Sequence, residues 1–148
     1  MSAIFIDSNV LLYVFDANAA QQQDQAEQVI RQLELTASGR LSVQCLAEFV
    51  NVSTRRLKPP LSISAALQQV EVFANTFPVF DLTLPIVLEA MRGTRDYHLA
   101  YYDAQLWATA KLHQIPVVLS EDFNDGRTIE GVRFVNPFAP DFSLANWT

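Results

Sequence analysis

The chain has 148 residues, half of them hydrophobic, which suffices for one well-buried core and is too little for two ordinary domains. No apolar run reaches the roughly 18 residues of a membrane span, and residues 1–5 lack the features of a secretory signal, so we expect a cytoplasmic protein with no membrane partner. One cysteine (Cys45) and two histidines argue against an internal disulfide and a zinc site, and the net charge of −6 is unusual for a nucleic-acid binder.

Short apolar runs alternate with stretches of helical periodicity along the chain. Continuous runs predict buried parallel strands, and apolar residues at positions i, i+3, i+4 and i+7 predict amphipathic helices. Ser62 or Ser64, and then Thr83, are candidate helix caps, and we take Gly93 as the boundary between the last two helices. The expected strands are 3–6, 41–43, 78–80, 116–119 and 132–135, and the expected helices are 10–15, 24–39, 46–58, 64–77, 84–91 and 99–112.

Strands that alternate with helices predict an α/β sandwich, in which a parallel sheet is covered on both faces. We find no internal repeat and no linker, and we assign no regular structure to the tail, 136–148. A single domain is therefore expected over 1–148.

Four acids are placed to meet at one edge of this sheet, because ligands bind beyond the carboxyl ends of parallel strands. Asp7 ends the first strand and Asp122 follows the strand at 116–119, while Glu48 and Asp103 lie early in helices. Three of the four have a simpler interpretation: Asp7 as a helix cap, Glu48 as a solvated helix residue and Asp122 as a loop acid.

Asp103 differs, because its helical neighbours at positions −4, +3, +4 and +7 are apolar and place it in the core stripe. A carboxylate is rarely buried unless it is paired or bound to a metal. The alternative is a structural salt bridge with Arg95 or with a more distant arginine.

Carboxylates that converge without histidine or cysteine form a hard, oxygen-rich site that suits Mg²⁺ or Mn²⁺. Such an ion bridges phosphate oxygens and activates water for attack on phosphorus, and its charge reverses the local field, so the net charge does not exclude RNA. Asn9 is a candidate to orient Asp7 or contact the substrate, and Ser120 to hydrogen-bond Asp122. Turn chemistry is the alternative for both.

The acids lie in four segments: FIDSNVLLY at 5–13, CLAEF at 45–49, YYDAQL at 101–106 and LSED at 119–122. In this order and spacing, over nearly the whole chain, they resemble the PIN-domain ribonucleases, and within them the VapC-type toxins of bacterial toxin-antitoxin pairs. The resemblance implies a three-layer α/β/α sandwich with a four- or five-stranded parallel sheet. It also implies Mg²⁺ at Asp7, Glu48, Asp103 and Asp122, and endonucleolytic cleavage of RNA leaving 5′-phosphate and 3′-hydroxyl ends.

The resemblance further implies a homodimer and a cognate antitoxin that blocks the site. An antitoxin arginine would displace the metal, and we expect its anchor on exposed apolar residues of the helices from Val10 to Leu33. Asp125 is either a fifth neighbour of the metal or part of the turn at 124–126, and we favour the turn.

Other functions fit the sequence less well. An aspartyl phosphatase needs a second aspartate where Asn9 stands. A receiver domain needs a phospho-accepting aspartate after a central strand, and the strand near Leu41 lacks one. A PIN-like protein that binds RNA or a partner without cutting is the alternative from another class, although all four acids are intact. Within the nuclease interpretation, a housekeeping RNA-processing role is the alternative to the toxin role. The short length of the chain favours the toxin role.

The target RNA cannot be read from the basic residues. Two small clusters are candidates for phosphate contacts, with solvated surface as the alternative, and neither histidine is expected to act as a catalytic base. The clusters are Arg55, Arg56 and Lys58, and Arg92 and Arg95; the histidines are His98 and His113.

Overall fold

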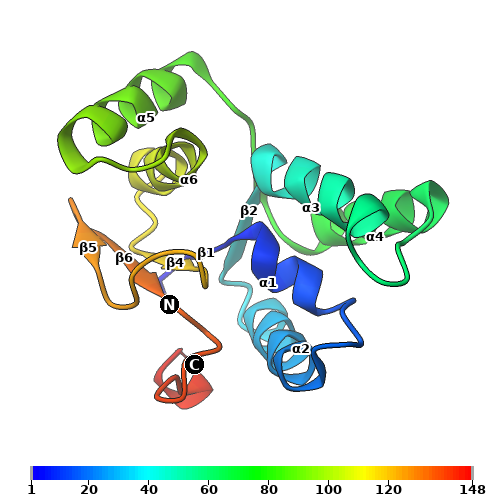
Figure 1. Cartoon of the computed structure of the whole chain (residues 1–148). Helices are drawn as coiled ribbons and strands as arrows, with labels where there is room; N and C mark the ends of the chain where they lie inside the picture. Colours follow the sequence, from blue (N-terminus) through cyan, green and yellow to red (C-terminus); the bar gives the residue numbers. More distant parts are fainter. Residues whose placement is uncertain (1, 148) are drawn as a thin grey trace.

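The computed structural model describes residues 2–147, in which strands and helices alternate (Figure 1). Among these residues, no helix combines the length and apolar character that a membrane span requires. The strands are β1 (Ile4–Ile6), β2 (Gly39–Ser42), β3 (Val79–Phe80), β4 (Val117–Leu119), β5 (Thr128–Ile129) and β6 (Val132–Val135). The helices are α1 (Ser8–Tyr13), α2 (Ala20–Leu35), α3 (Val43–Arg55), α4 (Ile63–Thr76), α5 (Leu84–Tyr97), α6 (Tyr101–Leu112) and the 3-10 helix η1 (Leu144–Trp147).

The described strands form one sheet in the order β3-β2-β1-β4-β6-β5. Five of them are parallel, with β1 between β2 and β4, and only β5 runs antiparallel to its neighbour β6. The predicted parallel sheet is confirmed; the antiparallel edge strand β5 was not expected, since its two residues carry no pattern. The strand order reverses between β1 and β4, the position at which open α/β sheets bind ligands.

Helices cover both faces of the sheet, so the predicted three-layer sandwich is confirmed (Figure 1). Successive strand residues point to opposite faces. Phe5 and Val118 pack in the core that includes residues of α5 and α6, whereas Ile4, Ile6 and Leu119 pack in the core of α1 to α4.

Two glycines do not mark helix ends, contrary to the sequence prediction. Helix α2 ends at Leu35, and Gly39 already begins β2, where a Cβ would lie 2.5 Å from the ring of Phe77. Helix α5 runs through Gly93, where a Cβ would lie 2.7 Å from the ring of Trp107. Both glycines therefore permit close packing against a ring.

The chain beyond β6 is also more ordered than the sequence predicts. The tail contains η1, where no regular structure was expected. Phe138, Phe142 and Leu144 pack against the core of α1 to α4, so burial of apolar side chains organises this segment.

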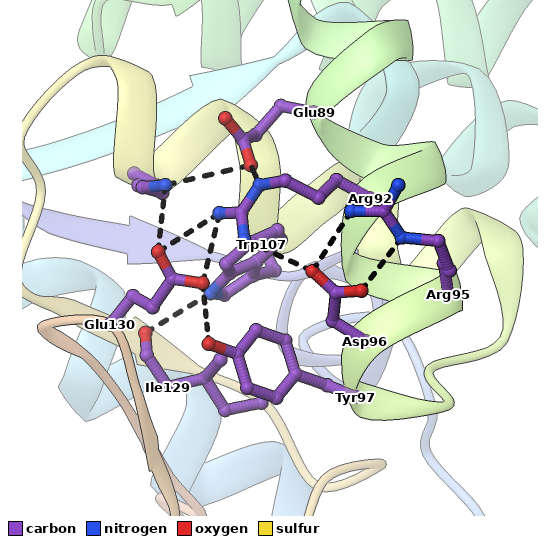
Figure 2. A network of polar contacts seen from close by, with 9 residues as sticks. Glu89, Arg92, Arg95, Asp96, Tyr97, Trp107, Ile129 and Glu130 are labelled. Carbon is purple, nitrogen blue, oxygen red and sulfur yellow. Dashed lines mark hydrogen bonds and ion pairs between the residues drawn. The ribbon is translucent and has the colours of Figure 1, made fainter.

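A polar network joins the turn between β5 and β6 to the helix layer (Figure 2). Glu130, in this turn, accepts hydrogen bonds from Arg92 of α5 (2.9 Å to each oxygen), Lys111 of α6 (3.0 Å) and the hydroxyl of Tyr97. The cationic groups of Arg92 and Lys111 lie 5.7 and 5.4 Å from the centre of the Trp107 ring. The network therefore places two cationic groups beside Trp107, the largest fully buried side chain among the residues whose burial is described.

Candidate active site

Asp7 directly follows β1 at the switch point of the sheet. Its Oδ1 accepts a hydrogen bond from the backbone N–H of Ser8 (2.7 Å) and caps α1, while its Oδ2 accepts one from the hydroxyl of Ser120 (2.7 Å), which follows β4. Asp7 is only 6% exposed. The cap and the site residue, which the sequence presented as alternatives, are thus the same side chain.

Asn9 and Ser120 connect Asp7 to Asp122. The side-chain amide of Asn9 lies within hydrogen-bond distance of Asp7 Oδ2 (3.3 Å), Ser120 Oγ (3.1 Å) and Asp122 Oδ2 (3.2 Å). Ser120 Oγ also accepts from the backbone N–H of Asp122 (3.1 Å). These contacts hold the exposed carboxylate of Asp122 beside the buried one of Asp7.

Glu48, in the second turn of α3, joins the cluster through residues that sequence reasoning missed. Its Oε2 accepts from the hydroxyl of Ser8 (2.8 Å), and its Oε1 accepts from the amide of Gln44 (2.9 Å). The amide of Gln105, in α6, donates in turn to Gln44 Oε1 (3.0 Å). Sequence signals existed for two of them, because Ser8 adjoins Asp7 and Gln44 lies one helical turn before Glu48.

Asp103 lies in the first turn of α6 and is partly exposed, so its predicted place in the core stripe is wrong. Helix α6 is buried from Ala104 to Ala110, whereas the three residues before Ala104 are partly or largely exposed. No basic side chain of residues 2–147 forms an ion pair with Asp103, and Arg95 pairs with Asp96 instead (2.7 Å). The alternative of a salt bridge to Arg95 is therefore excluded.

Burial and neighbouring negative charges raise the pKa values of two of the acids, Asp7 and Asp103. Burial raises the pKa of Asp7 from 3.8 to about 7, and the charges of Glu48 and Asp122 act in the same direction, outweighing the hydrogen bonds from Ser120 and Ser8. The pKa of Asp103 is also raised, first by burial and then by Asp122 and Glu48. The four acids that the sequence selects therefore occupy one region, and no cation among the described side chains pairs with them.

Asp125 forms a hydrogen bond to the chain that follows β6. Its Oδ1 accepts from the backbone N–H of Asn136 (2.9 Å), which ties the loop to the end of β6 and agrees with the turn interpretation. Of the basic residues, Arg92 and Arg95 are engaged in ion pairs, whereas Arg56 lines a pocket together with Asn9.

Both histidines lie outside the cluster. His113 stacks on the ring of Phe80, with centroids 3.8 Å apart, and is within hydrogen-bond distance of the carbonyl of Thr109. His98 adopts a left-handed conformation (φ 58°) at the end of α5.

The donor set fits a hard divalent cation, because the four acids offer only oxygen ligands and no positive side chain among residues 2–147 forms an ion pair with them. Asn9 Oδ1 is buried without a hydrogen-bond partner in the described structure, which adds an unsatisfied oxygen at the same place. As the side chains stand, no three His, Cys, Asp or Glu residues within 2–147 lie close enough to form a ready-made metal site. A cation would therefore have to draw the carboxylates together.

The motifs and the fold agree with one known family, since the family model of the PIN domain matches residues 4–126. The chain belongs to the PIN domain family. This match spans all four acids and confirms the resemblance at the level of the family. A comparison with curated proteins found no match for this PIN domain.

Solved structures share the fold of this PIN domain at low sequence identity. A toxin-antitoxin complex from Klebsiella pneumoniae has 22% identity and a TM-score of 0.65, with 93% of this chain and 98% of that chain covered. VapC20 of Mycobacterium tuberculosis, a sarcin-ricin loop cleaving toxin, has 18% identity and a TM-score of 0.67, with 88% of this chain and 99% of that chain covered. The DNA-bound VapBC complex of Salmonella typhimurium has 17% identity and a TM-score of 0.67, with 90% of this chain and 97% of that chain covered.

Proposed function

We propose that this PIN domain is a metal-dependent endoribonuclease and the toxin of a toxin-antitoxin pair. One observation carries the nuclease proposal: the four motif acids gather at the switch point of the sheet, one of them buried, and no cationic side chain in the described part of the chain pairs with them. Oxygen-rich clusters of this kind bind Mg²⁺ or Mn²⁺. The similarity of the fold to toxins of known structure supports the biological role.

In this proposal Asp7, Glu48, Asp103 and Asp122 hold Mg²⁺, which Mn²⁺ can replace. The bound ion would neutralise a phosphate and activate the attacking water. The surrounding polar residues act by orientation: Ser120 and Asn9 hold Asp7 and Asp122, and Ser8 holds Glu48. Correctly oriented ligands bind an ion with less reorganisation.

Cleavage of RNA by the purified chain tests the nuclease proposal. We expect mixed single-stranded RNA to be cut with Mg²⁺ or Mn²⁺ and to stay intact with a chelator, and the mapped products to carry 5′-phosphate and 3′-hydroxyl ends. Asp103→Asn and Asp7→Asn should abolish cleavage while the fold persists, because amides bind the ion weakly. Asp125→Asn is the matched control and should cut normally. Metal-dependent cleavage by Asp103→Asn, purified free of wild type, would contradict the mechanism.

Growth assays test the toxin role. Expression of the wild-type chain alone should arrest growth, expression with a small protein encoded next to it should not, and Asp103→Asn should be harmless in both cases. RNA cleavage in vitro without growth arrest would favour the housekeeping RNA-processing role. The homodimer stays a proposal as well, for which the mass of the protein in solution is the test.

The expected anchor for an antitoxin needs correction. No large apolar side chain between Val10 and Leu33 is exposed, because these helices turn their apolar residues into the core. The inhibitory arginine stays part of the proposal, since a guanidinium matches carboxylates and carries a fixed charge. Substituting the partner's arginines should therefore relieve inhibition of RNA cleavage at saturating partner.

A further inference from the structure

A largely apolar pocket of about 450 Å³ adjoins the acid cluster on the side of α3 and α6. Its volume is within the range of about 300–1,000 Å³ that is usual for small-molecule sites. The lining shares Glu48 with the cluster, so an occupant of the pocket would sit next to the proposed cleavage site. The pocket residues are Val43, Gln44, Ala47, Glu48, Leu82, Tyr102 and Gln105.

The apolar side chains of this pocket are unusually open to solvent. Tyr102 is 67% exposed, Leu82 48% and Val43 38%. An exposed aromatic ring beside aliphatic side chains offers a stacking surface for a flat apolar group. The pocket is therefore built to take such a group from solution.

Charge narrows the class of occupant. Among the described residues that line the pocket, only the acid Glu48 is charged, so a phosphate or an acidic peptide would be repelled. Two amides, Gln44 and Gln105, also line the pocket, and they hydrogen-bond to each other and, through Gln44, to Glu48. An unpaired nucleobase fits such a pocket, because it is a flat, neutral ring with hydrogen-bonding edges.

We propose that this pocket holds an unpaired nucleobase of the RNA, stacked on Tyr102, next to the phosphodiester that is cut. The inference rests on the proposed function and gives this pocket a role in holding one base of the substrate. Gln44 is part of both the pocket wall and the contacts of Glu48, and it also donates to the carbonyl of Tyr102 (2.9 Å). A base in the pocket thus contacts a residue that positions a proposed metal ligand.

Kinetics with base-free substrates tests this proposal. The probes are single-stranded oligoribonucleotides in which one residue at a time lacks its base. For wild type, loss of the base at one position beside the cut should raise KM about tenfold, as expected for a lost stacking contact. Tyr102→Ala should raise KM for the intact substrate by a similar factor, with kcat little changed, and then show no further loss with the base-free probe.

Two variants serve as controls. Tyr102→Phe keeps the ring and should behave as wild type, and Leu84→Ala removes another exposed apolar side chain (69%) outside the pocket and should have no effect. Because Tyr102 is exposed, its truncation leaves no cavity in the core, and an unchanged melting temperature would verify this.

Three results would overturn the proposal. They are a Tyr102→Ala variant with wild-type KM, a base-free penalty that persists in Tyr102→Ala, and a dimer that becomes monomeric in Tyr102→Ala, which would assign the pocket to a contact between copies. If wild type does not cut RNA at all, the proposed function fails. The pocket is then tested on the wild type by fluorescence anisotropy with the same labelled oligonucleotides, in which Tyr102→Ala should weaken binding about tenfold.

Discussion

Asp7 shows two opposing demands on one side chain. Its carboxylate caps α1 and receives the hydroxyl of Ser120, yet burial raises its pKa to about 7. The hydrogen bonds from the backbone N–H of Ser8 and the hydroxyl of Ser120 thus fail to offset the loss of water and the nearby negative charges. In the metal-free protein, this residue therefore lowers the stability of the fold at about pH 7 and above.

The pKa of Asp7 predicts how the stability of the metal-free protein varies with pH. Its pKa is higher in the folded state (about 7) than the ordinary value of 3.8, so the native state binds the extra proton and the free energy of unfolding falls as pH rises from about 4 to about 7. Asp7→Asn should remove this loss and stabilise the protein by about 1–2 kcal/mol at about pH 8.

Urea denaturation in a chelator, at about pH 5 and about pH 8, measures this effect. The exposed acid Asp125 provides the control, since Asp125→Asn should keep the wild-type dependence on pH. An identical pH dependence in wild type and Asp7→Asn would show that Asp7 ionises normally.

At the scale of elements, Gly93 couples α5 to α6. Glycine inside a helix usually costs about 1 kcal/mol relative to alanine, so Gly93→Ala would be expected to stabilise α5. Here a Cβ would lie 2.7 Å from the ring of the fully buried Trp107. We predict instead that Gly93→Ala destabilises the protein by about 1–3 kcal/mol, the usual cost of overpacking.

Thermal or urea unfolding measures the Gly93 effect. In a Trp107→Phe background, which provides a smaller ring, Gly93→Ala should cost less than in wild type. Equal costs in both backgrounds would show that the ring of Trp107 is not the cause.

The turn between β5 and β6 is attached to the helix layer by Glu130. The hydroxyl of Tyr97 and the ammonium of Lys111 hold the pKa of Glu130 at about 2, below its ordinary 4.5. A lowered pKa stabilises the fold above about pH 4.5, and the contribution fades as the pH falls towards 2. Glu130→Gln should therefore lower the melting temperature at neutral pH by about 3 °C, equivalent to about 1 kcal/mol for a partly exposed network.

Melting curves at falling pH check this prediction, since the difference between Glu130→Gln and wild type should shrink below about pH 4.5. Glu27→Gln is the matched control on the exposed face of α2 and should melt like wild type. A constant difference at all pH values would indicate lost packing and not lost charge.

At the scale of the whole molecule, the acids of the site come from four separate segments of the chain and meet only through the sheet. Mg²⁺ should bind the folded state and raise the melting temperature by linkage, since an ion at about 100 times its Kd adds about 2.7 kcal/mol. Asp103→Asn should show a much smaller rise, and Asp125→Asn the wild-type rise. Calorimetric scans with and without Mg²⁺ measure it; equal rises in wild type and Asp103→Asn would mean that Asp103 does not share the ion's site.

Local patterns in the sequence determined most of the elements and the identity of the site residues. The apolar runs at 3–6 and 116–119 predicted strands, and the structure has strands there. Ser62 and Thr83 cap the helices that follow them, as the sequence also predicted. Asp7 and Asp122 could be selected because a polar residue after a buried strand of a parallel sheet lies at the binding edge. These inferences depend on neighbours in the chain alone.

Tertiary contacts decided the rest. Gly93 was predicted to separate two helices, because the sequence does not show that the ring of Trp107, on another helix, packs against this position and leaves no room for a Cβ. Asp103 appeared buried because periodicity gives the face of a helix and not where the neighbouring layer ends. The contacts of Ser8 with Glu48 and of Ser120 with Asp7 join residues 40 and 113 positions apart, a distance that only the folded sheet closes.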